Sequence, residues 1–296
     1  MLNYSKSIIV LGASGFIGSS LIDKLLNYPL FGYSIYTISL KNISEFKKQF
    51  IELNLQKIND KRSSIKLNKI PKQITVINCA AARRNCTSAQ IKDANYVFPL
   101  FIANKILKQK GTDIRWIQLE SYWQYSKSTI ELREYVLWKN NFNKKLSILA
   151  KLPNFNFESV VLPHVIGAND DKNRFLNRIF SLIISNSPVL LKNASDKFYL
   201  CEKNDLNSYL YEQIKSEDLT SLNTTKLFPY YEISLENLVE LFKLITASNS
   251  KITFSSGTDS TNPKMELSVD LEKINHEYLT LTPLEQSLQS INNWLA

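Results

Sequence analysis

The sequence has little of what builds metal centres and disulfide frameworks. Its 296 residues include three cysteines and two histidines, and the cysteines form no Cys-x-x-Cys pair. Zinc sites need clustered ligands of these two types, and disulfide-rich folds need many paired cysteines. We therefore expect no metal site, and we expect Cys79, Cys86 and Cys201 to be reduced thiols in a cytoplasmic protein.

Long apolar runs and basic tracts are missing as well. The first apolar run, Ile8–Leu11, ends at Gly12, which makes it too short for a secretion signal or a membrane span, and no later run is long enough. The net charge is +9, but the basic residues form short, scattered runs such as Lys47-Lys48. We interpret them as solvated surface, which argues against partners such as membranes and nucleic acids.

Short apolar runs alternate with helical patterns in the first half of the chain. The runs that predict strands cover 8–11, 34–40, 50–55, 74–82, 114–119 and 157–163. This alternation predicts an α/β fold, a Rossmann-like, doubly wound parallel sheet that binds the cofactor in residues 1–165. The pattern loosens in residues 166–296, which we predict to form a smaller α/β substrate-binding lobe with some segments that return to the first domain. Within this lobe, Ser234 begins an amphipathic helix.

Glycine is also scarce, at seven residues, yet three glycines cluster near the N-terminus. Gly12, Gly15 and Gly18 follow the first predicted strand and precede a helical pattern. Glycine there permits a tight turn, lets backbone N–H groups approach a pyrophosphate and lets the helix pack close to the strand. The helix N-terminus adds partial positive charge, so the segment predicts a dinucleotide site.

The end of the second predicted strand indicates which dinucleotide binds. An acidic residue there would bind the free 2′-hydroxyl of NAD, but Ser39-Leu40-Lys41-Asn42 contains none. Lys41 would instead pair with the 2′-phosphate of NADP, with Ser39 or Asn42 as a further donor. This favours NADP(H), with NAD(H) as the alternative.

Tyr135 and Lys139 are four residues apart in a segment whose apolar residues have helical spacing. They would share one helix face, and a Ser-x-x-Glu capping box predicts that the helix begins near Ser128. A phenol with a pKa of about 10 is a weak acid at neutral pH, and a nearby ammonium lowers that pKa. Tyr135 would then protonate a carbonyl oxygen while a nicotinamide delivers hydride. The alternative is an ordinary aromatic core residue beside a lysine whose stem packs on it.

Together these segments resemble the extended short-chain dehydrogenases/reductases of the NAD-dependent epimerase/dehydratase family. GASGFIG (12–18), INCAAA (77–82), Asn95 and YVLWK (135–139) occur in the family's order. Tyr122-Trp123-Gln124 is similar to a Phe-Trp-Gln variant of nucleotide-sugar 4-ketoreductases. LPHVIGANDDKNRF (162–175) is similar to a segment of CDP-paratose and CDP-abequose synthases.

The resemblance implies roles for individual residues. Tyr135 would be the proton donor, Lys139 would also bind the nicotinamide ribose, and Asn95 would support the active-site helix. With the strand-end residues above, the cofactor-binding set is Gly12, Ser14, Gly15, Phe16, Ile17, Gly18, Ser39, Lys41, Asn54, Leu55, Ala80, Ala81, Ala82, Lys139 and Pro163.

The chain departs from the family at the catalytic serine or threonine, where it has Leu119. Ser121 lies two residues on, and so on the same side of a strand, which makes it the candidate catalytic replacement. The alternative is that Ser121 is a bystander. Glu120 occupies the place of a catalytic aspartate in dehydratases, but the glutamate that follows it there is absent here. We therefore interpret Glu120 as a strand-end carboxylate near the substrate.

Further polar residues are candidates for substrate binding. Arg83 and Arg84 follow the fourth predicted strand at its carboxyl end, where open α/β sheets bind ligands. By resemblance, Lys197 would replace an arginine that contacts the diphosphate, and His164 suits a structural role nearly as well. The full set is Arg83, Arg84, Glu120, His164, Asn169, Arg174, Phe175 and Lys197.

The resemblance implies NADPH-dependent reduction of the 4-keto group of a nucleotide-linked (di)deoxyhexose. The setting would be cytoplasmic synthesis of deoxysugars for surface polysaccharides such as O-antigen. Two alternatives stay open: an epimerase or dehydratase that retains NAD, and a non-catalytic nucleotide-binding scaffold. The family also implies a homodimer formed through the helices that flank the active site.

Overall fold

The protein is described by a computed structural model, in which the chain divides into two compact units. The first unit comprises Met1–Gln124, Thr129–Val161 and Leu210–Lys226, and the second comprises Tyr125–Ser128, Leu162–Tyr209 and Leu227–Ala296. The structure describes residues 6–30, 33–39, 51–54, 73–83, 86–109, 111–126, 132–216, 224–255, 271–274 and 279–296.

A parallel sheet forms the centre of the first unit. Its strands are β1 (Lys6–Leu11), β2 (Tyr33–Ser39), β3 (Ile51–Asn54), β4 (Gln73–Asn78), β5 (Asp113–Ser121), β6 (Phe155–Leu162) and β10 (Thr224–Leu227). Within this unit the order of the strands is β10-β6-β5-β4-β1-β2-β3. The chain therefore runs outward in both directions from β1, the doubly wound order that the sequence predicts.

The register of the sheet brings three strand ends together. Leu11 of β1 pairs with Asn78 of β4, and Asn78 pairs with Gln118 of β5, in parallel. The carboxyl ends of these strands consequently share one edge, where ligands bind in open α/β sheets. Both the glycine segment after β1 and Ala80–Ala82 after β4 begin at this edge.

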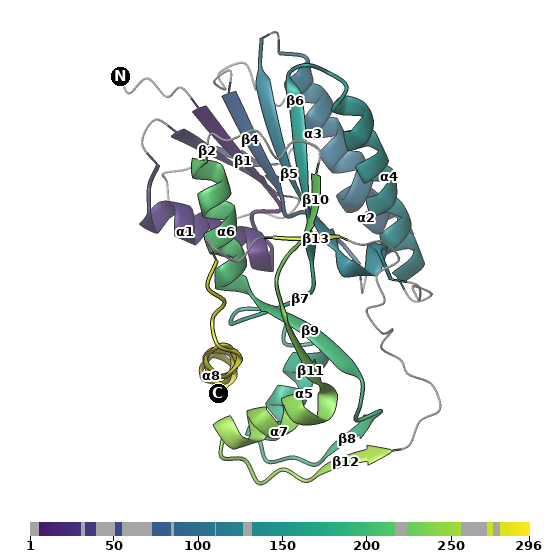
Figure 1. The fold of residues 1–296 in the computed structure, drawn as a ribbon, viewed down its shortest axis with the longest axis vertical. Helices are drawn as coiled ribbons and strands as arrows, with labels where there is room; N and C mark the ends of the chain where they lie inside the picture. The colour runs from purple at the N-terminus through teal and green to yellow at the C-terminus, as the bar shows by residue number, and fades with distance from the viewer. Residues whose placement is uncertain are drawn as a thin grey trace. The chain divides into compact units, whose positions relative to one another are not determined.

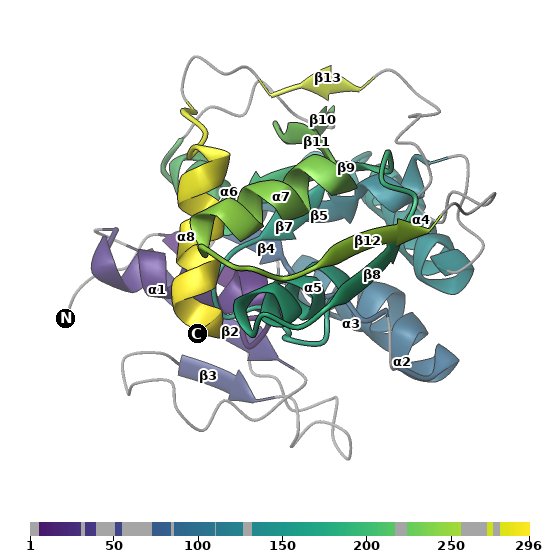
Figure 2. The ribbon, with the colours of Figure 1, turned by 90° about the horizontal axis from the view of Figure 1, so that it is seen from below.

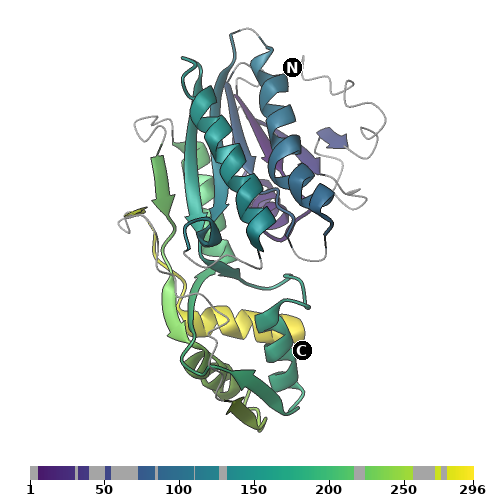
Figure 3. The same cartoon turned by 90° about the vertical axis from the view of Figure 1, so that its right-hand side faces the viewer.

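Helices cover both faces of the sheet (Figure 1). On one face lie α2 (Ser88–Lys92), a π-helical turn η3 (Asp93–Val97), α3 (Phe98–Leu107) and α4 (Arg133–Leu149), and Figure 3 shows α3 and α4 side by side. On the other face lie α1 (Phe16–Asn27) and the last turns of α6 (Lys203–Lys215). Within the described residues, every helix is too short or too polar to cross a membrane.

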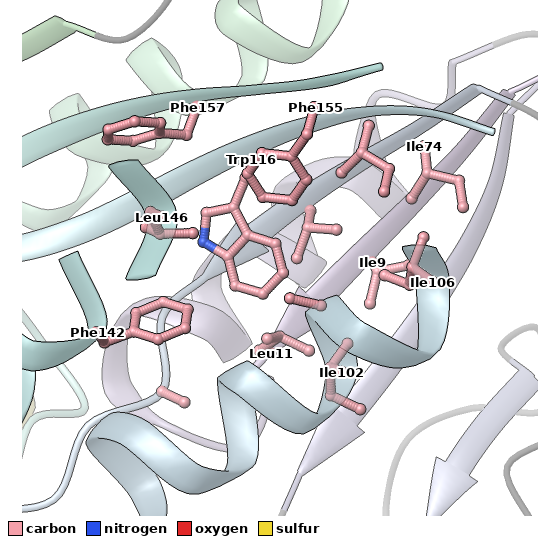
Figure 4. Close-up of a cluster of buried hydrophobic side chains, with 14 of the residues drawn as sticks. Ile9, Leu11, Ile74, Ile102, Ile106, Trp116, Phe142, Leu146, Phe155 and Phe157 are labelled. Carbon is pink, nitrogen blue, oxygen red and sulfur yellow. The ribbon is translucent and has the colours of Figure 1, made fainter. Parts of the chain in front are cut away.

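Packing around Trp116 fixes α4 on the sheet. Trp116 of β5 is fully buried, and its ring centroid lies 5.6 Å from that of Phe142 on α4 and 6.3 Å from that of Phe155 on β6. Figure 4 shows this ring among Phe142, Phe155 and Leu146. The buried residues of α4 are Tyr135, Lys139, Phe142 and Leu146, at spacings of four, three and four. Phe142 and Leu146 therefore anchor the helix whose buried face also carries Tyr135 and Lys139.

Arg115 connects the end of α6 to the sheet. Its guanidinium donates to the backbone oxygens of Gln213 (2.5 Å) and Ser216 (3.1 Å) and pairs with the buried carboxylate of Glu158 at 3.4 Å. The last carbonyls of a helix lack partners within the helix, so this cation satisfies them and complements the helix dipole. These contacts explain why residues 210–226 belong to the first unit.

The second unit contains two small sheets and three packed helices. One sheet has the order β11 (Tyr231–Ser234), β9 (Lys197–Glu202), β7 (His164–Ile166), and the other pairs β12 (Ile252–Ser255) with β8 (Val189–Lys192). Figure 2 shows helices α5 (Phe175–Ile184), α7 (Leu235–Ile245) and α8 (Leu284–Leu295) close to one another. They share a hydrophobic core, in which the ring centroids of Phe180 and Phe242 lie 4.0 Å apart. As predicted, Ser234 begins α7, because its hydroxyl caps the Asn237 N–H.

Candidate active site

A backbone cradle forms where β1 turns into α1. Gly12 has φ +74°, and the Gly15 N–H donates to the Gly12 oxygen at 2.9 Å. A Cβ on Gly12 would lie 2.7 Å from the Ala80 backbone, and one on Gly18 would lie 2.3 Å from the Gly12 oxygen. Side chains would fill this space, so both glycines are required by close approach and not only by the turn. The cradle and the N-terminus of α1 fit a dinucleotide pyrophosphate.

Two asparagines hold the segment after β4. The Ala80 N–H donates to Asn78 Oδ1 at 3.1 Å, and Asn78 Nδ2 donates to Gln118 Oε1 at 2.8 Å. Asn95, in the π-helical turn, donates to the oxygens of Ala82 (2.7 Å) and Ile91 (2.8 Å). Asn95 therefore holds the Ala80–Ala82 segment, whereas its predicted support of the active-site helix stays a prediction. π-helical turns of this kind often lie at functional sites.

Tyr135 and Lys139 lie on the buried face of α4, one turn apart. They are 7% and 5% exposed, and the Lys139 ammonium lies 5.7 Å from the centroid of the Tyr135 ring. Lys139 Nζ donates to the backbone oxygen of Leu119 at 2.7 Å, which gives the buried cation an acceptor. No residue in the described part of the chain forms a hydrogen bond with the Tyr135 hydroxyl.

The end of β5 lies against the same helix. Ser121 Oγ accepts from the Trp123 N–H at 3.4 Å, and Trp123 packs on the cluster formed by Ile91, Leu132 and Tyr135. Trp123 therefore links the turn after Ser121 to the helix that carries Tyr135. The Ser121 hydroxyl keeps its own hydrogen for a further acceptor, as the predicted replacement for the missing serine or threonine requires.

Glu120 and Gln124 form a pair that the sequence analysis did not identify. Glu120 is 3% exposed, and its Oε2 accepts from Gln124 Nε2 at 2.7 Å. The same nitrogen donates to Asn140 Oδ1 of α4 at 3.1 Å, while Gln124 Oε1 accepts from the Ser121 N–H at 2.9 Å. The contacts of Gln124 with Glu120 and Ser121 are local in the chain, at separations of four and three residues, whereas Asn140 is 16 residues away.

Cys79 is a further neighbour of the lysine. Burial of the thiol raises the pKa of Cys79 to about 12, and the charge of Lys139 offsets a smaller part of this rise. The thiol is therefore protonated at neutral pH and acts as a small, neutral side chain at the end of β4. The sequence predicts only a reduced thiol at Cys79, and no motif places this residue near Lys139.

The other predicted residues of the first unit lie at or beyond the strand ends. Ser39 and Asn54 end β2 and β3 and pair in register. Arg83 follows β4 and is partly buried. Lys41, Leu55 and Arg84 lie outside the described residues, as do Ser128 and Glu131 of the predicted capping box, and the helix itself begins at Arg133.

The second unit holds the remaining predicted residues. Arg174 Nη1 donates to Asp170 Oδ2 at 2.6 Å, and the Phe175 ring stacks on Phe198 at 6.1 Å. Asn169 has φ +65°, and the Lys197 ammonium is paired with the carboxylate of Glu232. Pro163 lies between β6 and β7, and His164 is the first residue of β7. Roles for these residues in binding a cofactor or substrate stay predictions.

Comparisons with known proteins place this geometry in a family. A model of the NAD-dependent epimerase/dehydratase family matches residues 8–195. CDP-abequose synthase of Salmonella typhimurium is 25% identical over 179 residues, which make up 60% of this chain and 58% of that protein. The match thus spans less than two thirds of that relative.

Solved structures show the same fold. The UDP-glucuronic acid 4-epimerase of Bacillus cereus, in complex with UDP-glucuronic acid and NAD, superposes with a TM-score of 0.74 at 13% identity over 98% of each chain. The dTDP-glucose 4,6-dehydratase of Bacillus anthracis, in complex with NAD, has a TM-score of 0.73 at 15% identity, over 98% of this chain and 96% of that one. The predicted Rossmann-like fold is confirmed, and because the family model matches well over half of its length, the chain belongs to the NAD-dependent epimerase/dehydratase family.

Proposed function

We propose that the protein is an oxidoreductase that uses NADPH to reduce the 4-keto group of a nucleotide-linked (di)deoxyhexose. The observation that carries the proposal is the buried Tyr135–Lys139 pair on α4, in the same unit as the glycine cradle. The similarity to CDP-abequose synthase supports a deoxysugar as the substrate class. The absence of an acidic residue in Ser39-Leu40-Lys41-Asn42 supports NADPH over NADH.

The proposed mechanism uses residues of the first unit. When bound, the cofactor supplies hydride to the carbonyl carbon. The backbone N–H groups at the start of α1 hold the pyrophosphate, and the Tyr135 hydroxyl donates a proton to the carbonyl oxygen, which completes the alcohol. The Lys139 ammonium, fixed by the Leu119 oxygen, stabilises the negative charge left on the Tyr135 oxygen. Ser121 would donate a hydrogen bond to the same carbonyl oxygen, and solvent would then reprotonate Tyr135.

A turnover assay tests this function. Purified protein is mixed with NADPH or NADH and with CDP-, dTDP- or GDP-linked 4-keto-6-deoxysugars, while the absorbance of the reduced nicotinamide is followed. We expect NADPH oxidation with one sugar, and loss of that oxidation in Tyr135→Phe. Tyr28→Phe is the matched control, because Tyr28, the residue that follows α1, is 60% exposed. An unchanged rate in Tyr135→Phe would overturn the assigned role of Tyr135.

The second candidate is an epimerase or dehydratase that retains and recycles NAD. The shared fold of the two NAD complexes supports it. The same assay separates the two, because a recycling enzyme changes the sugar, as detected by mass spectrometry or NMR, without net oxidation of NADPH. The non-catalytic scaffold, which Leu119 in place of a catalytic hydroxyl supports, predicts neither change. We also propose that the enzyme is a cytoplasmic homodimer and that it binds a nucleotide-diphosphate sugar as its substrate.

A further inference from the structure

We propose that Gln124 is a positioning residue, and that Glu120 acts through Gln124 and is not a catalytic acid. The side-chain amide of Gln124 connects the end of β5, which carries Ser121, to α4, which carries Tyr135 and Lys139. This inference rests on the proposed function for its kinetic consequences, but its structural content can be measured without turnover.

Three contacts fix the amide of Gln124 in one orientation. Its nitrogen donates to Glu120 at 2.7 Å and to Asn140 at 3.1 Å, and its oxygen accepts from the Ser121 N–H at 2.9 Å. If the amide were turned over, its oxygen would face the Glu120 carboxylate and its NH₂ group would face an N–H. Only one orientation therefore satisfies all three partners. Because Glu120 is 3% exposed, its carboxylate requires such a donor.

Two connections join the end of β5 to α4. Leu119 accepts from Lys139 through its backbone, and one residue further along each element Glu120 reaches Asn140 through Gln124. The two connections lie beside each other, so they resist rotation of the helix relative to the strand end. In this chain Leu119 supplies no hydroxyl, and the Gln124 network holds the backbone of the nearest residue that does, Ser121.

Three variants test the network. Gln124→Glu places a second carboxylate against Glu120, and like charges at this distance cannot both ionise at low cost. We expect a fall in kcat of about 100-fold at pH 8 with little change in KM, because small misplacement of reacting groups costs about that much. The deficit should shrink as the pH falls and the two carboxylates share one proton.

The exchange of the two side chains provides the rescue. In Glu120→Gln/Gln124→Glu the residue at 120 becomes the donor, while the carboxylate at 124 still accepts from Ser121, so kcat should return to within about tenfold of the original. Glu120→Gln alone keeps an acceptor for Gln124 and should lower kcat less than about threefold. A loss of about 100-fold or more in Glu120→Gln would instead indicate a catalytic acid and overturn the proposal.

Thermal unfolding between pH 5 and 8.5 separates this inference from the proposed function. In Gln124→Glu the shared proton has a folded-state pKa above the unfolded value, so stability is lost as the pH rises through that pKa and regained below it. Gln289→Glu, on the exposed face of α8, should show no such dependence.

If the original protein turns over none of the sugars, the proposed function fails, while the melting curves still decide on the network. A Gln124→Glu variant that melts like Gln289→Glu at every pH, or a double variant no better than Gln124→Glu, overturns the network.

Discussion

At the scale of single residues, Leu119 lacks the side-chain hydroxyl expected at its position but keeps the backbone contact with Lys139. The hydroxyl expected there is absent, but the backbone oxygen of Leu119 still accepts from Lys139 at 2.7 Å. Side-chain chemistry can therefore change at this position without loss of the contact that places the lysine. Ser121, the nearest hydroxyl in the sequence, is the predicted replacement, and the alternative is that Ser121 is a bystander.

We predict that Ser121→Ala lowers kcat about 100-fold with little change in KM, because a donor to the developing oxyanion contributes on that order. Steady-state kinetics with the sugar identified in the turnover assay measure the effect. Ser147→Ala is the matched control, since Ser147 is exposed on α4 and its hydroxyl donates to the Asn143 oxygen of the same helix. A Ser121→Ala variant within twofold of the original would show that Ser121 is a bystander.

Cys79 gives a pH-dependent prediction for stability. Its pKa is about 12 in the folded protein, above the unfolded value of roughly 8.5, so the unfolded chain loses the proton first as the pH rises. The folded state should therefore lose about 1 kcal/mol of stability, from this thiol alone, between pH 7.5 and 9.5. Urea unfolding of the original protein and Cys79→Ala at both pH values measures the difference. Cys79→Ala should lose less stability than the original over this interval, and equal losses would contradict the assigned burial of the thiol.

The sequence predicts only part of the residue-scale arrangement. The spacing of four between Tyr135 and Lys139 places both on one helix face, because the helical repeat alone decides it. The positions of Gln124 and Cys79 could not be predicted in this way. Cys79 meets Lys139, and Gln124 meets Asn140, through the approach of α4 to the ends of β4 and β5. That approach depends on the packing of Trp116 and Phe142.

At the scale of elements, local pattern predicts strands well and helix starts less well. The predicted runs 8–11 and 34–40 correspond to β1 and β2, because a buried strand is one short run of apolar residues. The helix that carries Tyr135 begins at Arg133 and not near Ser128. The helical segment before β5 begins at Ser88 and contains the π-helical turn Asp93–Val97. The turn precedes Pro99, which has no N–H to donate, so the irregular hydrogen bonding coincides with a residue that cannot continue a regular ladder.

The glycine segment gives a prediction at this scale. Gly18→Ala would bring a Cβ to 2.3 Å from the Gly12 oxygen, so α1 must shift away from β1. We expect a lower melting temperature and loss of the rise in melting temperature that NADPH gives the original protein. That rise corresponds to about 2.7 kcal/mol at 100 times Kd.

Asp23→Ala is the control for this variant, because Asp23 is exposed on the same helix. It should keep the NADPH-dependent rise. If Gly18→Ala also keeps the full rise, the cradle does not hold the cofactor, and the pyrophosphate site must be sought elsewhere.

At the scale of the whole molecule, the first unit follows from the sequence more fully than the second. Parallel βα units have one dominant handedness and short connections, so few arrangements of the predicted strands are available. In the second unit the strands are short, β9 pairs in parallel with β7 and antiparallel with β11, and β8 pairs with the distant β12. Such pairings depend on contacts between remote segments, which local pattern does not encode.

The exposed face of α4 leads to a prediction about assembly. Leu137 and Ile148 are 48% and 54% exposed, and they are eleven residues apart, which is about three helical turns, so they lie on one face. Exposed large apolar residues on one helix face favour a self-complementary contact between two copies.

We predict a homodimer that Leu137→Glu/Ile148→Glu converts to monomer, as measured by sedimentation velocity over a range of concentrations. Leu244→Glu, at a residue 77% exposed on α7, should leave the dimer intact. A dimer that persists in the α4 double variant would show that another surface forms it, and a monomer at every concentration of the original protein would contradict the predicted assembly itself.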